Sequence, residues 1–143
     1  ASTAYTNYGQ PIAHPLGANL KEQLHVIRYQ IAPKMYSMLR YIYIQYGADT
    51  GGTHWGQNIF EDYHKRQLQR APYYDLGNTI GQGVKTNVQY IDFTLTYMPW
   101  HNLFIELSYI YRNQTSKVPS LQLKSNMIYL NLRLNLPKRD MLF

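Results

Sequence analysis

Four side chains that can bind metals or move protons lie close together in the sequence: His54, Glu61, Asp62 and His64. A metal site needs three or four ligands that converge with fixed geometry, and this spacing matches no established signature such as HExxH. Solvated polar groups of a loop account for the cluster more simply. The sequence therefore predicts no metal and no other cofactor.

Four aromatic residues in the same stretch are candidates for binding a ligand, namely Trp55, Tyr63, Tyr73 and Tyr74. Exposed aromatic rings can stack on the apolar faces of sugar rings. Packing of the loop on itself is the simpler explanation of these residues. We retain them as candidate glycan-binding residues.

Catalytic groups are harder to find. Asp92 and Glu106 fall on neighbouring predicted strands, as paired carboxylates for glycoside chemistry would, but charge balance with Arg112 and Arg133 explains them more simply. A GxSxG elbow for serine hydrolysis is lacking. The glycine-rich stretch at residues 77–83 has no Gly-Lys-Ser/Thr, so it turns the backbone rather than cradling phosphate. The sequence predicts no catalytic residue and no enzyme.

The elements that position these groups are strands. Residues 127–136 alternate strictly, with aliphatic side chains at every even position and amides, Arg133, Met127 and Tyr129 at the odd ones. A soluble sheet with this pattern buries its apolar face under a second layer, for which the chain offers few apolar runs. The alternative is a transmembrane β-barrel strand, apolar toward lipid and polar toward the lumen.

Similar patterns predict five strands over residues 20–32, 35–47, 85–98, 103–114 and 121–136. Proline marks two short turns, at Pro33 and at residues 99–102, and a long loop spans residues 48–83. We predict an all-β fold, an antiparallel transmembrane β-barrel of which residues 1–143 supply about five C-terminal strands in one domain.

The alternation also predicts which way side chains face. Facing is least clear for residues 35–47, where Met38, Ile42 and Ile44 blur the pattern around Arg40. We expect lipid contact from Ile91, Phe93, Leu95, Leu103, Ile105, Leu107, Ile128, Leu130, Leu132 and Leu134. Charges expected in the lumen are Asp92, Glu106, Arg112 and Arg133, together with Arg28, Arg40 and Glu22.

Composition supports a membrane strand protein. Tyrosine occupies 15 positions, and strand-end aromatics suggest two girdles at membrane interfaces. The members of the girdles would be Tyr29, Tyr36, Tyr97 and Trp100 at one end, and Tyr43, Tyr46, Tyr109 and Tyr111 at the other. No run reaches the roughly 18 to 20 apolar residues of a membrane helix. The net charge of +6 is scattered, so we expect no nucleic-acid partner, and zero cysteines exclude disulfides and thiolate chemistry.

Loop lengths predict an orientation. The short turns fall at one end and the long loop at the other, as periplasmic turns and extracellular loops do in outer-membrane barrels. The C-terminus would then be periplasmic, with the terminal aromatic Phe143 similar to a barrel assembly signal, although residues 137–140 separate it from the strand. Since about eight strands are needed to close a barrel, we expect the missing ones to precede Ala1.

Three segments, residues 14–22, 55–63 and 76–83, resemble the C-terminal barrel region of Wzi-like capsule-assembly proteins, and most of all their RemB-like gliding-motility members in the Bacteroidota. The resemblance implies a non-enzymatic outer-membrane protein that serves surface polysaccharide or the motility and secretion apparatus. Its expected partners are outer-membrane lipid, surface polysaccharide and other outer-membrane subunits. A pore for small polar solutes, and an outer-membrane enzyme, are the alternatives.

Overall fold

A computed structural model describes residues 6–7, 10–11, 14–49, 54–58 and 77–135 of the chain. Regular structure in these residues is β except for one short 3-10 turn. Two pairs of residues form a small separate hairpin, β1 (Thr6–Asn7) with β2 (Gln10–Pro11). The large sheet comprises β3 (Leu20–Ala32), β4 (Met35–Ala48), β5 (Val84–Trp100), β6 (Leu103–Ser116) and β7 (Leu123–Leu134), with the 3-10 turn η2 (Pro119–Leu121) before the last strand.

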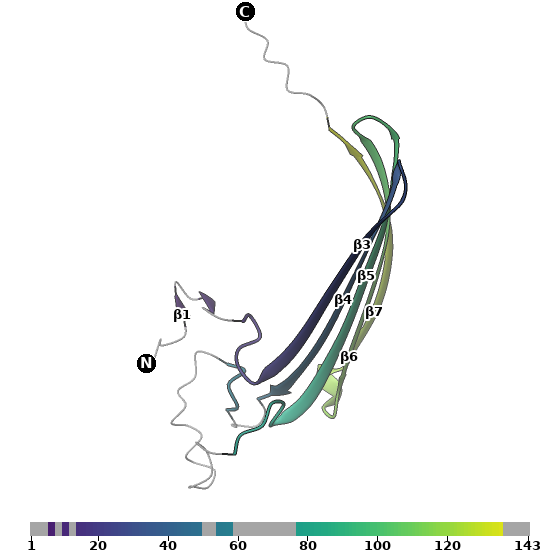
Figure 1. Ribbon diagram of the computed structural model, residues 1–143. Coiled ribbons are helices and arrows are strands. Elements are labelled where there is room, and N and C mark those ends of the chain that lie inside the picture. Colours follow the sequence, from purple (N-terminus) through teal and green to yellow (C-terminus); the bar gives the residue numbers. More distant parts are fainter. Residues whose placement is uncertain (1–5, 8–9, 12–13, 50–53, 59–76, 136–143) are drawn as a thin grey trace, which may run out of the picture.

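The five long strands form one antiparallel sheet in the order β3-β4-β5-β6-β7. The prediction of five antiparallel strands is confirmed. Figure 1 shows that the sheet is long and curved. It is also open, because β3 and β7 are its two edges and do not pair with each other.

The long connections gather at one end of the sheet and the tight turns at the other (Figure 1). β3 and β4 are joined through Pro33 and Lys34, and β5 and β6 through His101 and Asn102. Residues 49–83 and the η2 segment connect strands at the opposite end, which we call the long-loop end. The Lys34 ammonium donates to the Pro99 carbonyl at 3.0 Å and links the two tight turns.

The second tight turn lies two residues later than predicted. Pro99 and Trp100 belong to β5, and the register with β6 shifts between Tyr97 and Trp100. A proline is accommodated at such an irregularity because the ladder does not need its missing N–H there. Asn102 takes φ 66°, a left-handed conformation that asparagine tolerates better than most residues.

Strand β7 also begins later than the predicted residue 121. Pro119 stands at the start of η2, where its missing N–H costs nothing, and the amides of Leu121 and Gln122 donate back into that turn. The last described strand residue is Leu134, whereas the predicted strand reached residue 136, which lies outside the described residues.

Register assigns every strand residue to one of two faces, because cross-strand partners share a face. We call the face of Phe93 the apolar face and the face of Asp92 the charged face. The uncertain facing of β4 is settled by its pairing with β5. Leu39 lies opposite Phe93 on the apolar face, and Arg40 lies opposite Asp92 on the charged face.

Side-chain burial is slight for a chain of this length. Among the described residues the buried apolar core consists of Tyr46, Ala48 and Val88, against which Leu20, Ile44, Val84 and Leu121 pack. All of this core lies at the long-loop end. In the described part of the chain no helix is long and apolar enough to cross a membrane.

Candidate functional site

The exposed apolar face is the first feature that bears on function. The ten residues for which we expect lipid contact all share this face, since each pairs with another member or with a tyrosine of the neighbouring strand. Leu130 is 71% exposed and Leu132 is 72% exposed. A soluble protein rarely leaves so continuous an aliphatic surface uncovered. That this surface contacts lipid stays a prediction.

The apolar surface is a band with a sharp limit. Along β5, Ile91, Phe93 and Leu95 occupy the apolar face, and Gln89 and Lys85 succeed them toward the long-loop end. On β6 the change from Tyr111 to Asn113 falls at the same level, whereas His25 on β3 and Asn126 on β7 already stand level with Ile91. Beyond it lie Lys21, Gln23, Tyr43, Gln45, Asn87, Asn113, Thr115 and Lys124.

Beyond that same limit the polarity of the sheet is reversed. The residues that turn to the charged face there are the core residues Tyr46 and Val88, with Ile44 and Leu20 beside them. The sheet is therefore built in two zones. One exposes aliphatic side chains on the apolar face, and the other buries them on the opposite face, as a water-soluble sheet does.

Ion pairs occupy the charged face within the first zone. Asp92 is paired with Arg40, directly opposite on β4, at 3.6 Å, while Glu106 accepts a hydrogen bond from Arg133 at 3.0 Å. The guanidinium of Arg133 also lies 4.5 Å from the centre of the Phe104 ring, a cation–π contact.

The four charges predicted to face the lumen share this face. Arg40 balances Asp92 and Arg133 balances Glu106, while Arg112 donates to the Gln114 amide oxygen at 3.3 Å. The register is the reason, because it places Arg112 opposite Tyr90 and Arg40 opposite Asp92. Glu22, also expected there, accepts from His14 at 3.1 Å.

Paired-carboxylate chemistry does not fit this geometry. Glu106 lies opposite Thr96, which is four residues from Asp92 along β5. At a rise of roughly 3.3 Å per residue, the two carboxylates are separated by about 13 Å along the strand direction. The two acids of a glycosidase stand about 5 to 9.5 Å apart.

The predicted aromatic girdles need a correction. Tyr36 and Tyr46 lie on the charged face, opposite Thr96 and Thr86, so they belong to neither girdle. The reason is the alternation of side chains in β4: even-numbered residues lie on the charged face, and odd-numbered ones such as Tyr43 lie on the apolar face. The predicted members that remain on the apolar face are Tyr29, Tyr97 and Trp100 toward the tight turns, and Tyr43, Tyr109 and Tyr111 toward the long-loop end.

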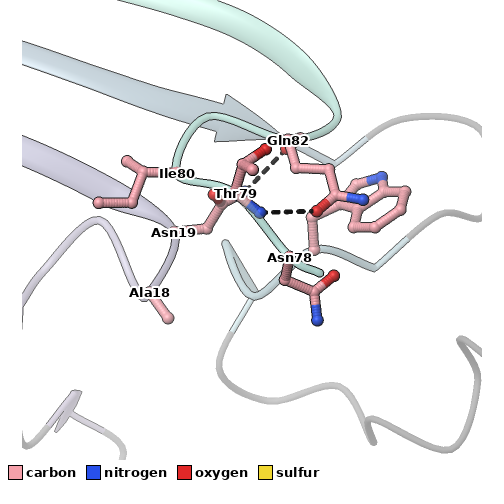
Figure 2. A pocket seen from close by; sticks show the side chains of 7 residues that line it. Ala18, Asn19, Asn78, Thr79, Ile80 and Gln82 are labelled. Atoms are coloured by element: carbon pink, nitrogen blue, oxygen red, sulfur yellow. Dashed lines mark hydrogen bonds between the residues drawn. The ribbon is translucent and has the colours of Figure 1, made fainter. Parts of the chain in front are cut away.

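A pocket of about 240 Å³ lies at the long-loop end (Figure 2). Its lining is uncharged and consists of Ala18, Asn19, Trp55, Asn78, Thr79, Ile80 and Gln82. An indole, amides and a hydroxyl are groups suited to a sugar, which offers apolar ring faces and hydroxyls. Of the four aromatic candidates Trp55 lines this pocket, and Tyr63, Tyr73 and Tyr74 lie outside the described residues.

Asn19 holds the pocket together. Its side-chain amide donates to the Gln82 carbonyl at 2.7 Å, and its amide oxygen accepts from the Gly81 backbone at 2.7 Å. These bonds fasten residues 79–82 to the start of β3. Gly47 permits the contact, because a Cβ there would collide with the Gln82 carbonyl.

Only part of the cluster of metal-capable side chains found in the sequence lies within the described residues. His54 lies 3.4 Å from the Asp49 carboxylate, which also accepts backbone hydrogen bonds from Trp55 and Asn58. Glu61, Asp62 and His64 lie outside the described residues. Within the described ranges no group of three metal-capable side chains occurs. The glycines at 77, 81 and 83 all have positive φ, which agrees with a role in turning the backbone.

No protein-family model, curated protein or solved structure matches the chain. The two faces and the pocket are therefore the features that bear on its function. The sequence placed Arg40 and Asp92 on the same face without pairing them, and it gave no sign of Asn19 as an anchor. The register between β4 and β5 brings Arg40 opposite Asp92. A reversal of the chain brings Asn19 to Gln82, which is 63 residues away in the sequence.

The Arg40–Asp92 pair yields a first prediction. The side chain of Asp92 is only 10% exposed and Oδ1 has no hydrogen-bond partner, so Arg40 supplies its compensating charge. Arg40→Met should lower the free energy of unfolding by about 1 to 3 kcal/mol, because it leaves a buried carboxylate unpaired. Urea titration of the folded protein measures this. Arg112→Met is the matched control, since Arg112 bonds a neutral amide; equal losses would refute the assignment.

Asn19 yields a second prediction. Asn19→Gly keeps the left-handed backbone at φ 63° but removes both side-chain hydrogen bonds. The Gly81 amide should then exchange with deuterium about 5- to 150-fold faster, because one hydrogen bond of about 1 to 3 kcal/mol no longer protects it. Asn102→Gly is the control at the other asparagine of positive φ, and it should leave Gly81 unchanged. Unaltered exchange in both variants would contradict the anchoring role.

Proposed function

We propose that this chain forms part of the wall of a bacterial outer-membrane β-barrel without enzymatic activity, serving surface polysaccharide attachment or the gliding-motility and secretion apparatus. The observation that carries the proposal is the uncovered apolar band on one face, backed by ion pairs on the other. Lipid solvates such a band favourably, and water in the lumen solvates the charges. A soluble sheet would instead expose the large apolar side chains of the band to water at a cost of roughly 1 kcal/mol or more each.

The dimensions of the band agree with a bilayer. From Ile91 to Trp100, β5 advances nine residues, or about 30 Å at roughly 3.3 Å per residue. A tilt of about 40° reduces this to a height of about 23 Å, close to the roughly 25 Å apolar band of outer-membrane barrels. The remaining residues of β5 would then stand outside the hydrocarbon at the long-loop end. This supports an extracellular long-loop end and tight turns on the periplasmic side.

Strand direction bears on how the barrel would close. β3 and β7 run in the same direction, because an odd number of antiparallel strands makes up the described sheet. A second copy in the same orientation would thus have to join β7 to β3 in parallel, whereas outer-membrane barrels are antiparallel. The proposal therefore requires an odd number of further strands from other segments, at least three for the smallest barrels.

A polysaccharide role is supported by the pocket at the long-loop end. Its indole and amide lining suits a sugar, and in the proposed orientation it faces the cell exterior. The pocket residues Asn19, Trp55 and Gln82 belong to the three segments for which the sequence predicts a resemblance to capsule-assembly proteins. Calorimetry with surface polysaccharide and a Trp55→Ala variant tests this role.

A pore for small polar solutes is the second candidate. The observation in its favour is that Arg28, Arg40, Arg112 and Arg133 all stand on the charged face, which would line the lumen. Single-channel recording of the protein in planar bilayers separates the two functions. Stable conductance that falls when Arg112 is replaced by glutamine favours the pore, and a closed barrel favours attachment.

The apolar band generates a prediction about β7. Leu132 lies on the apolar face opposite Ile105, and Asn131 lies on the charged face opposite Glu106. Leu132→Arg should destabilise the protein in lipid vesicles by about 2 to 4 kcal/mol, because a charge at the bilayer centre is desolvated. Asn131→Arg should cost far less. Equal losses in reversible unfolding from vesicles would remove the barrel assignment.

The open edges generate another prediction. In hydrocarbon the outer backbone groups of β3 and β7 would have no partners, and each unsatisfied group costs several kcal/mol. Residues 1–143 by themselves should therefore aggregate or pair with other chains in detergent or lipid. A fragment that supplies the missing strands should restore a heat-modifiable, protease-resistant species. A monodisperse, monomeric β-structured product from residues 1–143 alone would contradict the larger barrel.

A further inference from the structure

Three lysines stand on the apolar face just beyond the limit of the apolar band. They are Lys21 on β3, Lys85 on β5 and Lys124 on β7, and all three are exposed. We call this set the lysine belt. Because the three lysines occupy alternate strands and strands are about 4.8 Å apart, neighbours in the belt are separated laterally by roughly 10 Å.

The belt has no acidic neighbour on its own face. The strand residues around it there are amides, Tyr43 and Thr115. Glu22 lies on the opposite face and is bonded to His14. Asp49, the next carboxylate along the chain, accepts the backbone N–H groups of Trp55 and Asn58. The positive charge of the belt is therefore uncompensated within the described strands.

The belt lies just beyond a lipid headgroup layer, which is about 5 to 8 Å thick on each side of the hydrocarbon. Lys124 is four residues from Ile128, the last aliphatic side chain of the band on β7, and Lys85 is six residues from Ile91. These separations are about 13 and 20 Å along the strands, or roughly 10 and 15 Å along the membrane normal at a tilt of about 40°. Lysine side chains reach back toward an interface from such positions because they are long and flexible.

We propose that the lysine belt binds the phosphates of anionic lipids in the outer leaflet and so fixes the depth of the sheet in the membrane. The inference rests on the proposed membrane location. We infer an anionic lipid from charge complementarity, since basic side chains beside an apolar membrane surface attract anionic headgroups. The continuity of the belt with the apolar band, on one face of one sheet, favours lipid over an acidic polysaccharide.

The test measures lipid selectivity of the membrane-extracted protein, reconstituted in phosphatidylcholine vesicles that contain spin-labelled phosphatidylglycerol or spin-labelled phosphatidylcholine. The fraction of immobilised label gives the relative association of the two lipids. We expect at least a threefold preference for phosphatidylglycerol at low salt, falling toward one in 0.5 M NaCl. The triple variant Lys21→Gln/Lys85→Gln/Lys124→Gln should lose this preference. The triple variant with arginine at the same positions should retain it.

Control variants and outcomes separate this inference from the proposed function. Arg28→Gln/Lys34→Gln removes charge away from the belt and should keep the preference. Equal immobilisation of both labels by the unmodified protein overturns the lysine belt while leaving the barrel standing. Loss of polygalacturonate binding in the glutamine variant, with lipid preference intact, would make the belt a glycan site and overturn the proposal. Failure to immobilise either label would overturn both.

Discussion

The continuous ladder of backbone hydrogen bonds from β3 to β7 is the constraint on which the rest of the structure depends. Because side chains alternate with a period of two, one register for each strand pair decides the environment of every residue in it. A slip by one residue between β6 and β7 would move Leu130 and Leu132 among the charges and carry Arg133 into the apolar band. The ladder therefore fixes both the apolar band and the ion pairs at once.

In the proposed membrane location, a change of solvent along the strands explains the reversal of polarity. Where the surroundings are hydrocarbon, a strand gains by presenting Ile91 and Phe93 outward and keeping Asp92 inward. Where the surroundings are water, the opposite arrangement is favourable: Val88 is buried and Gln89 is exposed. A single strand, β5, carries both arrangements, and the apolar side chains of the neighbouring β6 end at the same level. The proposed membrane boundary is defined by that level.

The long-loop end combines the features of a small folded domain. A core around Tyr46 and Val88 is closed by Leu121 of η2, and Asn19 ties residues 79–82 to the sheet. The pocket with Trp55 thus stands on ordered backbone rather than on an isolated loop. Its uncharged lining contrasts with the lysine belt below it, so neutral sugars and anionic lipids would meet different parts of the same end.

The sequence by itself determined the strands and, except for β4, which residues of each strand share a face. Residues 127–136 and 91–97 alternate so regularly that a strand is the only element able to sort them, and local periodicity needs no knowledge of neighbours. What only the tertiary structure decided were the relations between strands. Of the arginines expected on the charged face, Arg40 is the one paired with Asp92. Tyr36 and Tyr46 leave the girdles, and Asn19 bonds residues 81 and 82. These contacts depend on register and on chain reversal across tens of residues, which no local pattern encodes.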